Sequence, residues 1–518
     1  MWSVTRAAAV VTVLTAGSTL LGFGRDVVIA ATFGAGAALD AYFVAQGLMN
    51  VVLGLIAGAM AKAAVPVTAR EAGSEDGRCQ QHRGFNVALS VTLIVLGLGS
   101  LVMWIAVTPV VAALAPGFAG AQAHLAQQLT RVVLVATVLI AGTNLLAGLV
   151  QAHGRFGWSG LQGVPFNLVM IAAAVLFGPQ YGVIALAWGF VAGSATRLLL
   201  QLIPTHQLGT RISFSLRLDD PAFREIARLV PALLVGSAIG NVNTLVDRAV
   251  GSTLAEGTIS ALGYAWRLVS LGETLLIASL LTALYPALGA YATDRARMRG
   301  LVDRGVAVTA VSLTPICVIL ACAAEPLVFT VFGHGGFSDA DAAVTAKAMV
   351  FYAPALLALG WRELVVRASY AVGDSSRPVG VAVAAMVVNV VGDLTLGLRY
   401  GITGLAASTT LSLVLAAGAN TWLLRRRHRA ISLRPAVTLL LRSAILATAA
   451  ACAGLVTRAL VPFDPTAGVL HAFAEAACIA AAVLVVYAAG LLITKAPEGG
   501  LLLRALNDAR PGRIRQPS

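Results

Sequence analysis

Residues 181–187 read YGVIALA and residues 400–406 read YGITGLA, so one apolar motif occurs twice, 219 positions apart. Other pairs recur in the same order at nearly the same spacing: Gly117-Phe118 with Gly336-Phe337, Tyr42 with Tyr264, Pro66 with Pro286, and Asn167 with Asn389. Five ordered matches at one spacing indicate an internal duplication. Each copy holds about six apolar segments, and an even number of crossings returns a chain to the same side of a membrane. The duplication therefore predicts two lobes of parallel topology, related by an axis along the membrane normal.

The composition indicates that both copies lie in a lipid bilayer. Of the 518 residues 58% are apolar and only 11% are charged, against about a quarter charged in an average soluble domain. Gly, Pro and charge clusters divide the chain into about fourteen apolar segments, and a membrane-spanning helix needs about 20 residues. The segments lie near 7–32, 38–66, 86–113, 124–152, 158–178, 182–204, 224–250, 257–290, 303–323, 343–372, 378–396, 401–424, 437–459 and 470–494. The segments are rich in Ala, Val, Leu and Gly without a polar alternation, which excludes a β-barrel as well as a soluble protein. The sequence predicts an all-α polytopic membrane protein.

The duplication and the segment count together predict three parts. Residues 1–217 form an N-lobe with the first six helices, and residues 218–429 form a C-lobe with the next six. Residues 430–518 add a hairpin of two helices and a basic cytoplasmic tail.

Basic residues gather in alternate loops between the apolar segments. The formal net charge is +13, and the densest run is Arg425-Arg426-Arg427-His428-Arg429. Loops rich in Lys and Arg face the cytoplasm, so both termini are expected there. This orientation explains the basic charge without nucleic-acid binding.

The first two segments of each lobe carry ionisable side chains, which are costly in a membrane and mark pathways or paired groups. These residues are Arg25, Asp26 and Asp40 in the first lobe, and Asp247, Arg248, Arg267 and Glu273 in the second. They predict a basic cavity between the lobes that suits an anionic head group. Arg25, Asp40, Arg248 and Arg267 are assigned to substrate binding, and Asp26, Asp247 and Glu273 to gating or charge balance.

Other readings of these charges stay open. Single residues can form structural ion pairs instead, such as Arg25 with Asp40 or Asp247 with Arg267. Three further arginines are expected to extend to the membrane interface: Arg131, Arg197 and Arg442. Asn167 and Asn389 are expected to form hydrogen bonds between helices.

Signals of catalysis and of metal binding are missing from the sequence. No GxxxxGKS/T, HExxH or GxSxG stretch occurs, and neither does a CxxC or a Cys/His cluster. We therefore expect a transporter and not an enzyme, with no metal and no cofactor.

A series of short motifs carries a family resemblance. The chain reads LGFGRD at 21–26, FGAG at 33–36 and DAYFVA at 40–45, and later APGF at 115–118 and GTISALGYA at 257–265. In this order the motifs resemble the MurJ/MviN family of lipid II flippases, within the MOP exporter superfamily. The resemblance implies two six-helix lobes around a cationic cavity and a last helix pair that shapes a groove for a lipid tail. It also implies alternating-access movement of an undecaprenyl-pyrophosphate-linked saccharide, either lipid II or a related cell-envelope glycan precursor. Movement would run from the cytoplasmic to the periplasmic leaflet of the bacterial inner membrane.

The resemblance also bears on the site and on the partners. By motif, Arg25, Asp40 and Arg267 match cavity charges of the family. Thr19, Leu53 and Gly54 stand where the family pattern has arginines, so the cavity is expected to be less basic. The implied partners are the lipid-linked glycan, membrane lipid and the cell-wall synthesis machinery, and the membrane potential or an ion would supply energy. Two alternatives stay open: a MATE-like ion-coupled small-molecule exporter, and a scaffold paralogue that does not transport.

Overall fold

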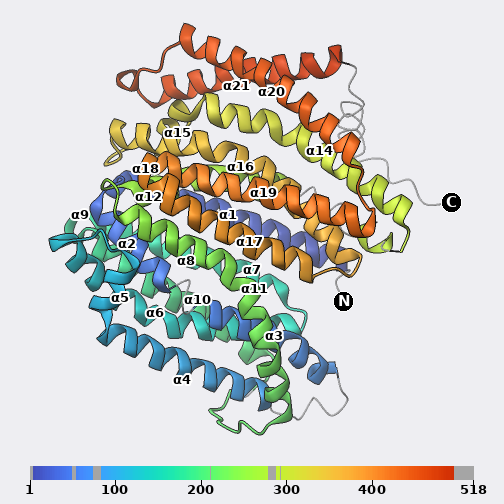
Figure 1. Cartoon of the computed structure of the whole chain (residues 1–518). Helices are drawn as coiled ribbons and strands as arrows, with labels where there is room; N and C mark the ends of the chain where they lie inside the picture. Colours follow the sequence, from blue (N-terminus) through green and yellow to red (C-terminus); the bar gives the residue numbers. More distant parts are fainter. Residues whose placement is uncertain are drawn as a thin grey trace. The chain divides into compact units, whose positions relative to one another are not determined.

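The protein, seen here as a computed structural model, is helical almost throughout (Figure 1). The structure describes residues 4–49, 54–73, 83–210, 212–277, 287–291 and 293–494, and no strand occurs in these ranges. The predicted all-α fold class is confirmed. Contacts divide the chain into two units, Met1–Ser260 with His334–Ser338 and Ala261–Gly333 with Asp339–Ser518.

Ten helices in the described ranges are long and apolar enough to cross a membrane. The four other predicted segments, near 7–32, 38–66, 224–250 and 257–290, are also helical almost everywhere that the structure describes them. The count of fourteen crossings and the lobe boundaries at 217 and 429 stay predictions. Leu53, Pro286 and the basic tail from 495 onward lie outside the described residues.

The first unit is built around the long helix α6, which packs against α2, α3, α4 and α10. The structure gives its elements as α1 (Val4–Phe33), α2 (Ala37–Leu48), α3 (Gly54–Gly73), α4 (Arg83–Ile105), α5 (Val107–Leu114), α6 (Gly120–Ala152), α7 (Phe156–Leu161), α8 (Gly163–Ala172), the π-helix η3 (Ala173–Phe177), α9 (Gly178–Tyr181), α10 (Val183–Gln207), α11 (Pro221–Ser252) and the first turn of α12 (Thr258–Gly272). Buried apolar residues of α3, α4, α6 and α11 form one core cluster, around Phe85, Leu145 and Phe223. Burial of this kind fixes how these four helices pack.

The second unit is built around α16, which packs against α14, α15 and α19. Its elements are the rest of α12, the π-helix η4 (Glu273–Ile277), α14 (Arg295–Cys322), α15 (Ala324–Phe332), α16 (Asp339–Ala371), α17 (Ser376–Gly392), the π-helix η5 (Asp393–Gly397), α18 (Leu398–Tyr400), α19 (Ile402–His428), α20 (Leu433–Leu460), the short 3-10 helix η6 (Pro465–Ala467) and α21 (Val469–Ile493). The last pair, α20 and α21, pack against each other and against α14 (Figure 1).

The helix boundaries repeat along the chain as the duplicated motifs do. The central helices α6 and α16 each have 33 residues and begin at residues 120 and 339, a difference of 219. Each unit also has a π-helix, η3 or η5, followed by a glycine with positive φ. Gly182 has φ 60° and ψ −149°, and Gly401 has φ 64° and ψ −139°. Backbone of this kind is essentially confined to glycine, so both copies keep the Tyr-Gly pair for the same reason.

A short segment from later in the chain completes the first unit. The amide of Gly336 donates a hydrogen bond to the Ala31 carbonyl near the end of α1, over 2.6 Å. Gly335 has φ 60°, and a Cβ there would overlap the same carbonyl oxygen. Residues 334–338 therefore lie against α1, and only glycine fits at 335.

Candidate functional site

Arg25 lies in α1 within a network of polar side chains. Its Nε and Nη2 atoms donate to Asp26 Oδ1 over 3.0 and 2.7 Å, and both side chains are largely buried. Its Nη1 donates to Asn167 Oδ1 over 3.1 Å, while Asn167 Nδ2 donates to the Ser18 carbonyl over 3.2 Å. Asn167 thus joins α8 to α1, which confirms the predicted hydrogen bond between helices. A guanidinium has five N–H donors, and these bonds within the described residues use three of them.

Arg197 shares an aromatic ring with Arg25. The Arg197 guanidinium carbon lies 5.3 Å from the centre of the Phe166 ring, and that of Arg25 lies 5.8 Å from the same centre. The buried Nε of Arg197 has no hydrogen-bond partner among the described residues. Two guanidinium groups therefore lie around one ring, and the carboxylate of Asp26 lies beside the guanidinium of Arg25. An anion would stabilise this arrangement, because a cation in a region of low polarity is costly unless it is paired.

The sequence predicts that Arg197 extends to the membrane interface, whereas the structure places its guanidinium beside the Phe166 ring. The position of Arg197 along its helix is the signal that could have predicted a buried arginine instead of an interfacial one. Arg197 lies near the middle of α10, which runs from Val183 to Gln207, whereas arginines that reach the interface stand near helix ends.

Asp40 lies in the first turn of α2 and is 2% exposed. Its Oδ2 accepts a hydrogen bond from the Gly257 amide over 2.8 Å, and its Oδ1 accepts from the amide and the hydroxyl of Ser260, each over 2.7 Å. The carboxylate therefore caps the first turn of α12, where the partial positive charge of a helix N-terminus favours an anion. Arg25 forms its ion pair with Asp26 and not with Asp40. The assignment of Asp40 to substrate binding stays a prediction.

Arg248 reaches from α11 to α2 within the first unit. Its Nη1 donates to the Phe43 carbonyl, and its guanidinium lies where a Cβ on Gly47 would be. The absent side chain of Gly47 thus makes room for the arginine. Asp247 is close enough to act on Arg248 electrostatically.

The remaining two candidate residues lie in the second unit. Arg267 is exposed on α12, and its carbonyl accepts a hydrogen bond from Ser270 Oγ over 3.0 Å. Glu273, in η4, lies near α16, where Arg362 attracts its carboxylate and Glu363 repels it. Glu363 also forms an ion pair of 3.2 Å with Arg367, at i,i+4 spacing. The seven predicted charges are thus divided between the two units, with Arg25, Asp26, Asp40, Asp247 and Arg248 in the first.

A second polar network lies in the second unit around Asn389. Asn389 Nδ2 donates to Asp393 Oδ2 over 2.7 Å, and its Oδ1 accepts from Ser412 Oγ over 3.2 Å. Ser408 Oγ donates to the other oxygen of Asp393. All four residues are buried. Asn389 therefore links α17 to α19, as predicted.

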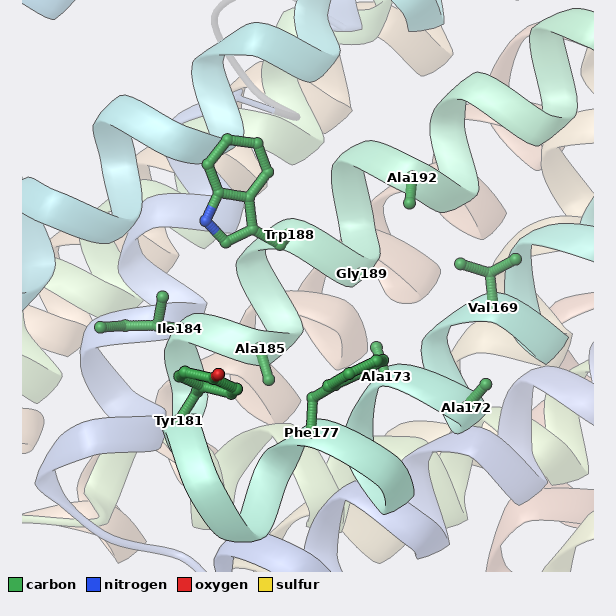
Figure 2. A pocket seen from close by; sticks show the side chains of 10 residues that line it. All are labelled: Val169, Ala172, Ala173, Phe177, Tyr181, Ile184, Ala185, Trp188, Gly189 and Ala192. Carbon is green, nitrogen blue, oxygen red and sulfur yellow. The ribbon is translucent and has the colours of Figure 1, made fainter.

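An apolar pocket of about 490 Å³ lies between η3 and α10 (Figure 2). Phe177, Tyr181, Ile184 and Trp188 are among its ten lining residues, none of which is charged. The pocket therefore suits hydrocarbon and does not suit an anionic group.

One charge cluster lies outside the membrane-spanning helices, in the loop between α16 and α17. Asp374 accepts hydrogen bonds from Arg377 Nη1 and, over 2.9 Å, from His428 Nε2. Partial burial acts to raise the pKa of Asp374, but the hydrogen bonds from His428 and Arg377 hold that pKa below its usual value. The cluster ties this loop to the end of α19.

Comparisons with known proteins agree over most of the chain. The family model described as lipid II flippase MurJ matches residues 29–492. A probable lipid II flippase MurJ from Haemophilus influenzae is 29% identical over 432 residues, which cover 79% of this chain and 83% of that protein.

Two solved structures share the fold. A lipid II flippase MurJ in an inward closed conformation superposes with a TM-score of 0.78 at 20% identity, covering 93% of this chain and 99% of that one. An inward-facing MATE family multidrug transporter of the MOP superfamily gives a TM-score of 0.64 at 16% identity, covering 81% of this chain and 98% of that one. At such identities the likeness shows the fold alone.

Proposed function

The chain belongs to the MurJ family of lipid II flippases, and we propose on this basis that it carries lipid II from the cytoplasmic to the periplasmic leaflet by alternating access. The family match over residues 29–492 is the observation that carries the proposal. It makes the chain a multi-pass protein of the bacterial inner membrane and a member of a transporter family. We also propose that the arginines discussed below hold the head group and that the membrane potential or an ion supplies the energy. Both termini would lie in the cytoplasm, and the protein would contact the cell-wall synthesis machinery.

The diphosphate of the cargo would contact Arg25 and Arg197. Both guanidinium groups lie around the Phe166 ring, and Asp26 forms an ion pair with Arg25. Arginine binds phosphate oxygens in a fork geometry, and hydrogen bonds of this kind are about twice as strong as those between neutral groups. Asn167 fixes the direction of Arg25 through its amide oxygen.

Arg197 supplies a second basic group beside the Phe166 ring in a chain that lacks arginines of the family pattern at other positions. Thr19 replaces a first-helix arginine, and its hydroxyl donates to the Thr15 carbonyl over 2.9 Å within α1. Gly54 replaces another arginine at the start of α3. The second guanidinium near Arg25 therefore comes from α10. Arg248 and Arg267 stay proposed cargo contacts, and Asp247 and Glu273 stay proposed charge-balancing groups.

The membrane potential would drive the outward step. A diphosphate carries about two negative charges, and an inside-negative potential of about 100 mV is worth about 2.3 kcal/mol per charge. Both charges crossing the full field would gain about 4–5 kcal/mol. An ion that moves with the cargo is the other proposed source of energy. The isoprenoid tail can stay in the bilayer, because only the head group must leave water.

The two alternatives gain no separate support. The MATE transporter shares the fold at 16% identity, and a likeness at that level does not indicate a shared cargo. An exporter of organic cations needs an acidic site, whereas the described cluster holds two arginines and one carboxylate. A scaffold that does not transport would leave lipid II in its starting leaflet.

The test is flipping of fluorescent lipid II in liposomes that contain the purified full chain. A reagent that cannot cross the membrane quenches only the outer leaflet, so the accessible fraction reports transport. Arg25→Ala and Arg197→Ala are compared with Arg131→Ala, a matched control. Arg131 lies in the same unit and stacks on an aromatic ring too, 5.4 Å from the centre of Trp104.

Loss of a charge-assisted contact predicts a drop of about tenfold or more for Arg25→Ala and Arg197→Ala, and a change within about twofold for Arg131→Ala. If lipid II crosses no faster than in protein-free liposomes, the proposed function fails. If transport occurs but survives both substitutions, the function stands and the assigned site is wrong.

A further inference from the structure

Glu475 is a buried carboxyl group in the last helix, α21. It is 1% exposed, and neither of its carboxyl oxygens has a hydrogen-bond partner among the described residues. It lies six residues after the first residue of α21, Val469, which places it about 9 Å along the helix. The charge bias of the loops predicts that this end of the helix pair is periplasmic.

One guanidinium lies near this carboxyl group. Arg458, near the end of α20, forms an ion pair with Glu325 of α15, with 2.6 Å between Nη2 and Oε2. Arg458 is also close enough to act on the charge of Glu475, as are His471 and Glu325. Glu325 and Glu475 are therefore two carboxyl groups beside one arginine.

The other elements packed against α21 add little charge at this place. The end of α14 presents Cys322, whose Sγ donates to the Ala451 carbonyl over 3.8 Å. Before η6, Asp464 accepts hydrogen bonds from the amide and the hydroxyl of Thr466, over 2.8 and 2.6 Å. The carboxylate of Asp464 is thus occupied with its own turn. In the described part of these elements, no second arginine or lysine acts on the charge of Glu475.

A small pocket borders the ion pair. It has a volume of about 300 Å³ and is lined by Glu325, Asp339, Arg458 and Phe463, with Pro462 and Pro465. A space of this size can hold water, since one water molecule takes about 30 Å³ of liquid volume. Water in it would contact Glu325 and Arg458, and the Arg458 side chain has room to move.

We propose that Glu475 is a proton-binding site and that its loss of the proton transfers Arg458 from Glu325 to Glu475. An ionised carboxylate with no donor in an apolar place is disfavoured, so the group keeps its proton while Arg458 is bound to Glu325. Release gives the proton to water and leaves a carboxylate that attracts the guanidinium. Glu325 lies on α15, Arg458 on α20 and Glu475 on α21, so the transfer changes which helices are tied together. The site would respond to pH on one side of the membrane.

Infrared spectroscopy of the full chain in lipid nanodiscs tests this directly, because a protonated carboxyl group has its own C=O stretching band. The difference spectrum between the wild type and Glu475→Gln is expected to show such a band, which disappears as the pH is raised. Glu363→Gln is the matched control. Glu363 lies in an apolar helix of the same unit but has its own arginine partner, 3.2 Å away, so its removal should leave the band unchanged.

A second variant tests the shared arginine and leaves Glu475 in place. Glu325→Gln frees Arg458, so the Glu475 band should disappear at a pH about one to three units lower than in the wild type. Two results would overturn the proposal. One is the absence of any band that depends on Glu475, and the other is a band whose pH dependence is unchanged by Glu325→Gln. Glutamine resembles the protonated carboxyl group in shape, so Glu475→Gln should fold normally. If Glu475→Gln does not fold, the shift of the band in Glu325→Gln tests the proposal instead. These measurements do not depend on lipid transport, so their outcome is separate from that of the flippase proposal.

Discussion

Asp40→Ala should destabilise the protein strongly, because the Asp40 carboxylate accepts three short hydrogen bonds from the start of α12. A hydrogen bond to a charged group contributes about 1.5 kcal/mol or more, so three of them amount to about 4–5 kcal/mol. In the variant the amides of Gly257 and Ser260 would be left buried without an acceptor, and buried donors without an acceptor destabilise the folded state. Ser260→Ala removes the hydroxyl, which donates to Asp40 Oδ1 and also lies 3.0 Å from the Gly257 carbonyl oxygen, and should cost about 1.5 kcal/mol.

The assay is the free energy of unfolding by denaturant in detergent micelles, for the wild type, both single variants and the double variant. The hydrogen bond between the Ser260 hydroxyl and Asp40 is lost in both single variants and in the double variant, so its energy is counted twice when the two single losses are added. The double-mutant cycle should therefore give a coupling energy of about 1.5 kcal/mol between Asp40 and Ser260. A loss below about 1 kcal/mol for Asp40→Ala, or a coupling near zero, would refute the reasoning. Wild-type stability together with lost lipid transport would instead support the predicted contact between Asp40 and the cargo.

Four further substitutions test other parts of the structure. Gly47→Ala places a methyl group on the Arg248 guanidinium, so it should displace that side chain and destabilise the protein by about 1–3 kcal/mol, measured by unfolding. Gly182→Ala and Gly401→Ala should each cost about 1–3 kcal/mol by the same measurement, because alanine disfavours their backbone angles; unequal effects would count against a shared origin of the two turns. Asp374→Asn should lower the melting temperature at neutral pH. The lowered pKa of Asp374 contributes stability that is present above its ordinary value of 3.8 and is lost as the pH falls through the lowered pKa. The difference between wild type and variant should therefore shrink below about pH 4, and a difference that persists in acid would contradict this account.

The helices could be predicted from the sequence because apolar length and charged loops determine them locally. The segment expected near 124–152 is α6, Gly120–Ala152, and the segment near 343–372 is α16, Asp339–Ala371. The hydrogen bond between Asn167 and α1 also followed from a polar residue in an apolar run. Each of these inferences uses a signal that lies within one stretch of chain.

The partners of the charged residues could not be read in this way. Asp40 binds backbone amides 217 and 220 residues later, and a backbone amide has no residue type that a sequence could show. The role of Arg197 depends on Phe166, which an arginine of α1 shares. The state of Glu475 could not be predicted either, because its lack of a hydrogen-bond partner among the described residues is a property of its surroundings.

The contact of Gly336 with Ala31 has a consequence for the synthesis of the protein. The ribosome must add 305 residues after Ala31 before Gly336 exists, which takes roughly 15–60 s at about 5–20 residues per second. The end of α1 therefore lacks its contact with residues 334–338 while most of the chain is inserted. A chaperone or another membrane protein that covers this helix end during translation would have to leave before residues 334–338 can take their place.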